Sequence, residues 1–265
     1  MVDLRGRTAL VTGGTMGIGL ETAVALAAAG ARLAVTYKWG TADEDEVRRR
    51  FAAAAAPPPL IVRADAAREE DTAEVMARLR GFGRLDIFVS NVSAALVVGG
   101  LDDYSRKDLH RTIDASAWPL VAYTEAIRRT FGRAPRYIVG LSSTGVDHYT
   151  RGYDFMAASK AVLETLVRYL NYRLAGEDVR INVVRSRNVR TQALFDTFGA
   201  GFEQFARRFV RDEHFVDARE VAEAVLALAS GMLDGFSGQV LTVDRGMTFF
   251  DNLMRLYHER EALGL

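Results

Sequence analysis

The chain has 265 residues, of which 49% are hydrophobic, and this suits one sizeable domain with a single core. Lysine plus arginine and aspartate plus glutamate each total 34, so the charge balance predicts no attraction to nucleic acid or to a membrane surface. The chain contains no cysteine, which excludes disulfides, thiolate catalysis and cysteine metal sites.

No targeting or membrane segment is predicted. The first strand begins within a few residues of the start and no long uncharged apolar run occurs, so we expect a cytoplasmic protein. No metal site is expected either, because His110, His214 and His258 lack partners at metal-ligand spacing.

The first predicted unit is a strand, a glycine-rich turn and a helix. Thr8–Val11 is apolar and β-branched, the turn runs from Thr12 to Gly19, and the helix ends at Gly30. Glycines let a backbone approach a pyrophosphate closely, and the helix directs free N–H groups at that anion. The pattern favours a dinucleotide site, although glycines that serve packing alone would also produce it. The cofactor-binding candidates in this turn are Gly13, Thr15, Met16, Gly17, Ile18 and Gly19.

Apolar strand-like runs and helical segments then alternate to the end of the chain. The further predicted strands are Arg32–Tyr37, Leu60–Arg63, Leu85–Ser90, Tyr137–Leu141, Val179–Val184 and Val240–Val243. The further predicted helices are a segment from about Asp43 to Ala56, Glu69–Arg80, two within Ser105–Phe131, Tyr153–Ala175, a segment near Ala193–Arg211, Ala218–Ala229 and a terminal helix at about 250–263.

This alternation predicts the α/β class, with a doubly wound parallel sheet (Rossmann fold) covered by helices on both faces. We find no internal repeat and no linker, so residues 1–265 are expected to form one domain. The variable segment at about 192–215 and the terminal helix are expected to cap a substrate pocket.

Several motifs in this order resemble the short-chain dehydrogenase/reductase (SDR) superfamily over nearly the whole chain. They are Thr12–Gly19, Asp65, Asn91-Val92-Ser93, Leu141-Ser142-Ser143, Ala158-Ser159-Lys160-Ala161 and Gly238-Gln239 with Val243-Asp244. The resemblance implies a nicotinamide cofactor, contacted by Asn91, Lys160 and Val189 as well as by the glycine-rich turn. It also implies a homotetramer or homodimer.

The long helix carries an unusual spacing. Most members place the catalytic tyrosine four residues before the lysine, where this chain has Met156. Tyr153 lies seven residues before Lys160, almost two helical turns, so both side chains project from nearly the same face. This spacing resembles the enoyl-[acyl-carrier-protein] and enoyl-CoA reductase branch. The alternative is that Tyr153 only caps or packs the helix start and that catalysis is lost.

The resemblance suggests further site residues. Ser143 lies where the superfamily places a catalytic serine, although a plain turn serine is an equal alternative. Ser93, His148 and Met156 are candidates for the wall of a substrate pocket. A lone loop histidine is more often a surface residue, and His148 is open to that interpretation.

The end of the second predicted strand bears on the cofactor. An aspartate there would bond the ribose 2′-hydroxyl and repel a 2′-phosphate, whereas this chain has Lys38 followed by Trp39. Lys38 supplies a cation for the phosphate and Trp39 a surface for adenine, which favours NADP(H). Asp65 is expected to bond the adenine amino group or to cap the helix that follows.

Three features depart from the superfamily pattern, and one of them is Arg245, since the common Asp-Gly-Gly near the end of the chain is replaced by Asp244-Arg245-Gly246. Ser116 stands where the family has an asparagine that supports a water beside the lysine. Arg187 and Asn188 stand where small residues and glycine usually pass the nicotinamide. Arg187 would either block that pocket or contact a phosphate or carboxylate of the ligand. Arg185 is interpreted more simply as an ion-paired residue at a strand end.

Together these features predict an NADPH-dependent oxidoreductase that reduces an α,β-unsaturated acyl thioester. The acyl group would be carried on CoA or on acyl carrier protein, in specialised, polyketide or fatty-acid-like biosynthesis. Two alternatives stay open. One is an NADPH-dependent ketoreductase on the same scaffold, and the other is a divergent protein that has lost redox activity, either a pseudo-enzyme or a non-redox catalyst.

Overall fold

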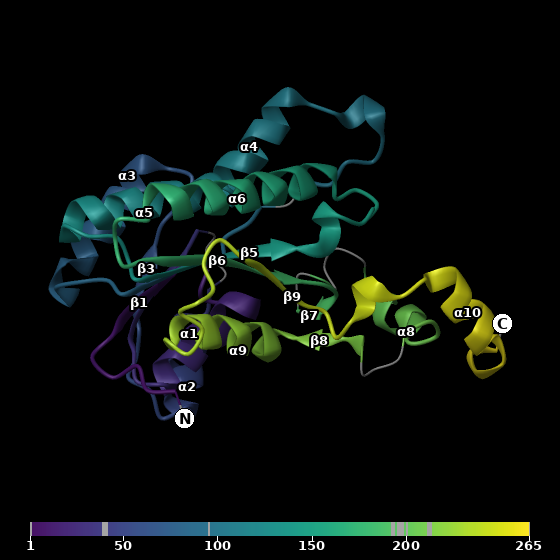
Figure 1. Cartoon of the computed structure of the whole chain (residues 1–265), viewed down its shortest axis with the longest axis horizontal. Helices are drawn as coiled ribbons and strands as arrows, with labels where there is room; N and C mark the ends of the chain where they lie inside the picture. The colour runs from purple at the N-terminus through teal and green to yellow at the C-terminus, as the bar shows by residue number, and fades with distance from the viewer. Residues whose placement is uncertain are drawn as a thin grey trace.

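A parallel sheet with helices on both faces forms the body of the molecule (Figure 1). The computed structural model of the chain describes residues 2–38, 42–94, 96–191, 194, 199, 201–210 and 214–264. Within them, seven strands pair in the order β3-β2-β1-β4-β5-β6-β9. The predicted α/β fold with a doubly wound parallel sheet is therefore confirmed.

The central strands are buried on both faces, as their continuous β-branched and apolar sequences predict. All the pairings in this sheet are parallel, including that of β1 with β4, which places Val11 beside Val89. The strands are β1 (Thr8–Val11), β2 (Arg32–Tyr37), β3 (Leu60–Arg63), β4 (Ile87–Ser90), β5 (Tyr137–Ser143), β6 (Arg180–Ser186) and β9 (Val240–Val243).

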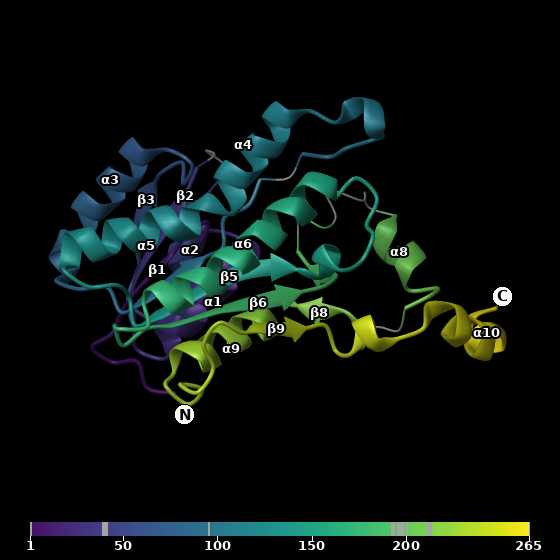
Figure 2. The ribbon, with the colours of Figure 1, turned by 45° about the horizontal axis from the view of Figure 1, so that its top comes forward.

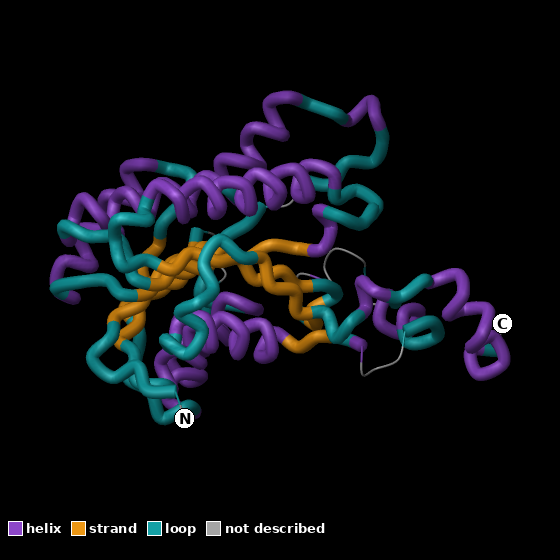
Figure 3. The backbone as a smooth tube through the Cα atoms, viewed as in Figure 1, coloured by secondary structure: helices purple, strands orange, loops and turns teal. Residues whose placement is uncertain are grey.

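Two layers of helices cover the sheet (Figures 1 and 3). One layer comprises α1 (Gly17–Ala28), α2 (Glu44–Ala53) and α9 (Ala218–Ala229); the other comprises α3 (Glu69–Leu79), α4 (Arg106–Ser116), α5 (Trp118–Phe131) and α6 (Asp154–Arg173). Each layer closes a separate apolar core against the sheet. Phe51 and Val225 belong to the first core, and Phe88 and Leu163 to the second.

The strands that carry the site are longer than the sequence predicts. β5 continues through Ser142 and Ser143, and β6 continues through Arg185 and Ser186, because the two strands stay paired up to Ser143 and Ser186. The side chains at these strand ends are polar, so hydrophobic periodicity does not predict that the strands continue there.

Short elements lie beyond the carboxyl ends of the strands (Figure 2). A small parallel pair, not predicted from the sequence, joins β7 (Val189–Arg190) to β8 (Val216–Asp217). Much of the expected capping segment at 192–215 lies outside the described residues, but α8 (Phe202–Ala206) belongs to it. The terminal helix α10 (Asn252–Leu263) lies beside it, since Arg255 donates a hydrogen bond to the Phe209 carbonyl.

Candidate active site

The strand order reverses between β1 and β4, so the segments that follow these two strands turn to opposite faces of the sheet and leave a crevice. Asn91, directly after β4, joins the two sides of this crevice. Its side-chain amide donates to the carbonyls of Thr12 and Gly13, each at 3.0 Å. The glycine-rich turn is thereby held against the end of β4, where the motif order predicted a cofactor contact.

The glycine-rich turn fits an anion at the start of α1. Met16, the residue before α1, makes no capping hydrogen bond with its side chain, and the first turn of α1 contains no acidic residue. A Cβ on Gly19 would lie 2.2 Å from the Gly13 carbonyl oxygen, so the turn closes only with glycine there. Gly17, at φ 53°, opens the helix in the left-handed region. Uncapped N–H groups at a positive helix end suit a pyrophosphate.

A cleft of about 340 Å³ continues from this turn toward α6, a volume typical of small-ligand pockets. It gathers candidate residues that are far apart in the sequence. Those that line it are Ile18, Asn91, Ser93, Ser143, His148, Tyr153, Met156, Lys160, Arg187 and Val189. The other candidates, Gly13, Thr15, Met16, Gly17 and Gly19 of the turn and Lys38 and Asp65 at the ends of β2 and β3, lie outside its described walls.

Tyr153 directly precedes α6 and is held there by packing and by the turn before it. Its backbone N–H donates to the Thr150 carbonyl, and its ring lies against Gly145, where a Cβ would approach Cδ1 to 2.6 Å. Burial raises the pKa of Tyr153, and a hydrogen bond with Ser143 acts in the opposite direction. The hydroxyl is therefore a protonated donor at neutral pH, with the Ser143 hydroxyl beside it.

Lys160 reaches the same cleft from the next turns of α6. The residue is 5% exposed, and Nζ donates to the Leu141 carbonyl of β5 at 2.8 Å. Burial lowers the pKa of Lys160 to about 8, and the negative charge of Glu164 opposes that change. A lysine held in this way keeps most of its charge at neutral pH and presents its remaining N–H groups to the cleft.

A buried ionic network beneath the site was missed by the sequence reasoning. Glu164 accepts a hydrogen bond from the Ser142 hydroxyl at 2.6 Å and two from the Arg185 guanidinium. Arg185 also pairs with Asp147, in the loop that leads to Tyr153. The interpretation of Arg185 as an ion-paired strand-end residue is confirmed. The available signal for Glu164 was an acid four residues after Lys160 on an apolar helix face.

Lys38 and Asp65 face each other across the ends of β2 and β3. The Lys38 ammonium is 2.6 Å from an Asp65 carboxylate oxygen. Asp65 also accepts a hydrogen bond from the Ala67 backbone N–H, whereas Arg68 is the residue that precedes α3, so Asp65 closes a turn and does not cap that helix. Trp39 lies outside the described residues.

The departures at Ser116 and at Arg187 and Asn188 have local explanations. Ser116 is buried at the end of α4, and its hydroxyl accepts a hydrogen bond from the Ala94 N–H at 3.1 Å. It therefore anchors the segment after β4. Asn188 has φ 48°, in the left-handed region that asparagine tolerates better than most residues, so it can follow the strand where glycine is usual. Arg187, just before it, is half-buried and lines the cleft.

Met156 and His148 form further parts of the wall. Met156 is 3% exposed and occupies the position that most members give to the tyrosine. His148 is half-buried, and its Nδ1 lies 3.2 Å from the Thr144 carbonyl oxygen. Because a carbonyl oxygen only accepts hydrogen bonds, this contact favours the tautomer that carries its proton on Nδ1. His148 therefore contributes to the cleft rather than to the open surface.

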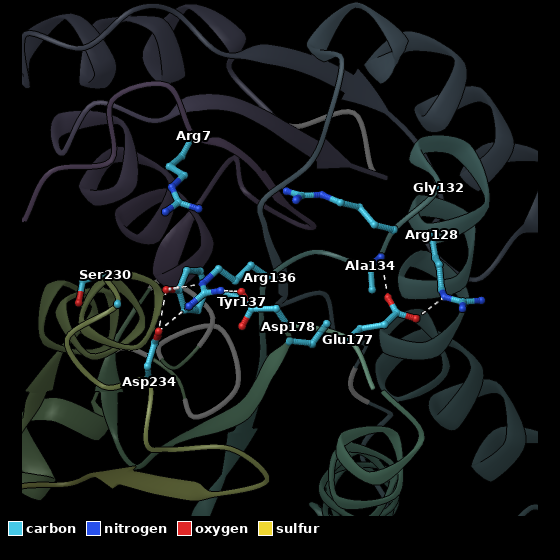
Figure 4. A pocket seen from close by; sticks show the side chains of 13 residues that line it. Arg7, Arg128, Gly132, Ala134, Arg136, Tyr137, Glu177, Asp178, Ser230 and Asp234 are labelled. Atoms are coloured by element: carbon cyan, nitrogen blue, oxygen red, sulfur yellow. Dashed lines mark hydrogen bonds and ion pairs between the residues drawn. The ribbon is translucent and has the colours of Figure 1, made fainter. Parts of the chain in front are cut away.

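A larger cavity of about 740 Å³ opens at the opposite edge of the sheet, where the strands begin (Figure 4). Ion pairs dominate it: Arg128 lies 2.7 Å from Glu177, and Arg136 lies 2.6 Å from Asp234. Tyr137 donates a further hydrogen bond to Asp234. These groups hold the turns before β5, β6 and β9 together, so we place the candidate site in the smaller cleft at the carboxyl edge.

Fold and cleft together define an α/β oxidoreductase of the short-chain dehydrogenase/reductase superfamily. Within it, residues 13–248 match the family described as Enoyl-(Acyl carrier protein) reductase, and the chain belongs to that family. The suspected resemblance is thus confirmed.

Known relatives cover almost the whole chain. It is 29% identical over 256 residues to the enoyl-(acyl-carrier-protein) reductase (NADH) of Aquifex aeolicus, covering 92% of both chains. The crystal structure of that enzyme superposes with a TM-score of 0.80 over 94% of this chain and 98% of the other. A short-chain dehydrogenase from Burkholderia cenocepacia in complex with NADP gives a TM-score of 0.79 at 27% identity, over 92% and 99% of the chains. The relatives thus include one named for NADH and one crystallised with NADP.

Among the described residues, no group of three or more histidine, aspartate or glutamate side chains is placed to hold a metal ion. Within the same ranges, no helix has both the length and the apolar character needed to cross a membrane.

Proposed function

We propose that the protein is an NADPH-dependent reductase of an α,β-unsaturated acyl thioester. The observation that carries this proposal is the convergence of Tyr153 and Lys160 on one cleft, although they are seven residues apart. Membership of the enoyl-(acyl carrier protein) reductase family supports the same reaction class.

The cofactor would lie along the carboxyl edge of β1 and β4. The uncapped start of α1 and the glycine-rich turn would hold its pyrophosphate, while Lys160 would bond the ribose hydroxyls. Lys38 supplies the cation that favours a 2′-phosphate, although Asp65 shares that cation at 2.6 Å. We therefore propose NADPH as the preferred cofactor, with contacts from Asn91 and Val189 in the cleft.

When bound, the nicotinamide supplies a hydride to the β-carbon of the enoyl group. Negative charge then develops on the thioester oxygen. The Tyr153 hydroxyl is protonated because burial raises its pKa, so it can donate a hydrogen bond to that oxygen as the charge appears. Ser143 and Lys160 line the same cleft, where the serine hydroxyl would help to orient that of Tyr153 and the charge of Lys160 would favour transfer of the tyrosine proton.

A ketoreductase is the second candidate, and the position of Ser143 in the same cleft as Tyr153 and Lys160 favours it. A serine, a tyrosine and a lysine in one cleft can also bind a ketone oxygen and protonate the alkoxide that forms there. The same residues would act, but on a different bond of the substrate.

The test combines cofactor binding with turnover. NADPH and NADH are titrated against the folded protein by nicotinamide fluorescence, and NADPH oxidation is then followed with enoyl thioesters and with ketones. We expect tighter binding of NADPH and oxidation with the enoyl thioesters. Oxidation with ketones alone would select the ketoreductase. Failure of both cofactors to bind would contradict both proposals and leave a scaffold without redox activity.

Three wider features belong to this proposal. The acyl group would be delivered on CoA or acyl carrier protein, in a specialised biosynthetic pathway. The assembly would be a homotetramer or homodimer, which sedimentation of the purified protein measures directly. The compartment would be the cytoplasm.

A further inference from the structure

The cleft is cationic. Of the residues that line it within the described ranges, Lys160 and Arg187 are positively charged and none is an aspartate or glutamate. Lys160 donates a hydrogen bond to the Leu141 carbonyl, and the negative charge of Glu164 stabilises its ammonium group. Arg187 is the second cation, and its environment decides what the cleft can bind.

The guanidinium of Arg187 has N–H donors available for a ligand. Among the described residues, it interacts with Asp244 through electrostatic attraction. The carboxylate of Asp244 already accepts hydrogen bonds from the N–H groups of Gly246 and Thr248, at 2.9 and 2.8 Å. Burial alone would raise the pKa of Asp244, but these bonds and the charge of Arg187 together lower it. The five N–H donors of the Arg187 guanidinium thus remain for a ligand.

The backbone holds Arg187 at the wall of the cleft. The residue follows the last residue of β6, and Asn188, at φ 48°, turns the chain sharply into β7. Ser186 and Val189 on either side are buried, so the short turn between the two strands is anchored at both ends. An arginine presented in this way matches the geometry of a carboxylate or phosphate, which it can bind through two parallel hydrogen bonds.

The other residues of the cleft wall indicate whether this oxyanion belongs to the cofactor or to the substrate. The start of α1 and the glycine-rich turn already suit the pyrophosphate of the cofactor, so a second cation is left for the substrate. Ser93, Ser143 and Thr150 contribute hydroxyls to the same walls. These hydroxyls lie beside apolar side chains such as Leu141 and Met156, and such a mixed wall suits a short acyl chain that ends in a polar group.

We propose that Arg187 is a specificity-determining residue that binds a carboxylate on the acyl group of the substrate. This inference rests on the proposed function for the reaction, but it concerns binding and can be measured without turnover. The substrate class is then an enoyl thioester whose acyl chain ends in a carboxylate.

The test uses two matched ligands. Both are 2-enoyl thioesters of N-acetylcysteamine, which carries no phosphate; one acyl chain ends in a carboxylate and the other in a carboxamide. Dissociation constants are measured calorimetrically with the parent protein, Arg187→Gln and Arg187→Lys. Arg151→Gln serves as the control, since Arg151 is an exposed arginine outside the described walls of this cleft. Circular dichroism and thermal unfolding establish that each variant is folded.

We expect the parent to bind the carboxylate ligand about 10- to 100-fold more tightly than the carboxamide, as for a charged hydrogen-bonded pair. Arg187→Gln should abolish this ratio, Arg187→Lys should retain part of it, and Arg151→Gln should leave it unchanged. Equal binding of the two ligands by the parent would overturn the inference. So would a loss confined to NADP⁺ affinity in Arg187→Gln, because the oxyanion would then belong to the cofactor.

The failure of the inference and that of the proposed function are distinguishable. NADPH oxidation with equal kcat/KM for both ligands would support the reaction and overturn the role of Arg187. A carboxylate preference in binding without NADPH oxidation would support the role of Arg187 and contradict the reaction.

Discussion

The Arg185 guanidinium holds both carboxylate oxygens of Glu164, with Nε 2.8 Å from Oε1 and Nη2 2.6 Å from Oε2. The side chains are 14% and 4% exposed, so this pair joins β6 to α6 in a setting largely sealed from water. Through Asp147 the same guanidinium also reaches the loop that precedes Tyr153. The pair therefore links the position of the tyrosine to that of the lysine helix.

Removing one member of this pair should destabilise the protein strongly. Arg185→Leu leaves the Glu164 carboxylate buried without its main partner, and we expect the free energy of unfolding to fall by about 3–5 kcal/mol. The double variant Arg185→Leu/Glu164→Leu should recover most of that loss, because neither charge is then left buried. Urea denaturation of all three proteins measures the effect. Arg219→Leu, which breaks an exposed pair with Glu223, is the control and should change little.

Tyr153→Phe should reduce turnover of an enoyl thioester about 10²- to 10³-fold, because the donor to the developing negative charge is lost. The ring and its packing against Gly145 remain, so NADPH affinity should stay within about twofold of the parent. Tyr149→Phe is the matched control, since Tyr149 lies in the same loop but is 87% exposed. Parent-like turnover by Tyr153→Phe with a confirmed substrate would show that the hydroxyl has no catalytic role.

Cofactor binding should depend on the charge of Lys160. Burial lowers its pKa to about 8 from 10.5, so the folded chain binds fewer protons than the unfolded chain between those pH values. The contribution of Lys160 to stability therefore increases as pH rises through that interval, while the cation that bonds the ribose is lost. We expect the NADPH dissociation constant to rise about tenfold between pH 7 and pH 9. Lys160→Met should bind weakly at both pH values, and an equally steep pH dependence in that variant would assign the titration to another group.

Gly145→Ala should displace Tyr153 without disturbing the cofactor turn. The new Cβ would lie 2.6 Å from Cδ1 of the Tyr153 ring, closer than such atoms approach, so the ring must shift. A shift of this kind costs about 10- to 100-fold in turnover when the reacting groups lose alignment. Steady-state kinetics and an NADPH titration separate the two effects. Gly81→Ala, where the new Cβ meets nothing within 4 Å, should retain parent activity.

Cofactor preference should depend on Lys38. Lys38→Met removes the cation proposed for the 2′-phosphate, and we expect NADPH affinity to fall about tenfold while NADH affinity stays nearly constant. Higher salt should narrow the difference between NADPH and NADH affinity in the parent, because the Lys38 side chain is partly exposed. Lys107→Met, at an exposed position on α4, controls for the loss of one positive charge. An equal loss for both cofactors would indicate that Lys38 acts through Asp65 on adenine instead.

The sequence by itself determined the architecture and the class of protein. Strand and helix periods, with glycines where the backbone turns, were enough to predict the doubly wound sheet, and Thr8–Val11, Arg32–Tyr37 and Ala218–Ala229 match the observed elements residue for residue. Local patterns suffice here because apolar periodicity and turn residues act within a few positions of one another.

The tertiary structure decided which side chains share an environment. Arg185 meets Glu164, and Lys38 meets Asp65, across separate strands and helices, so no local pattern reveals these partners. The same holds for the sharp turn at Asn188 that presents Arg187 to the cleft, and for β7 and β8, which pair only because the fold brings them together. Charge pairing, burial and the shape of a cleft depend on contacts distant in sequence, and the folded chain alone determines them.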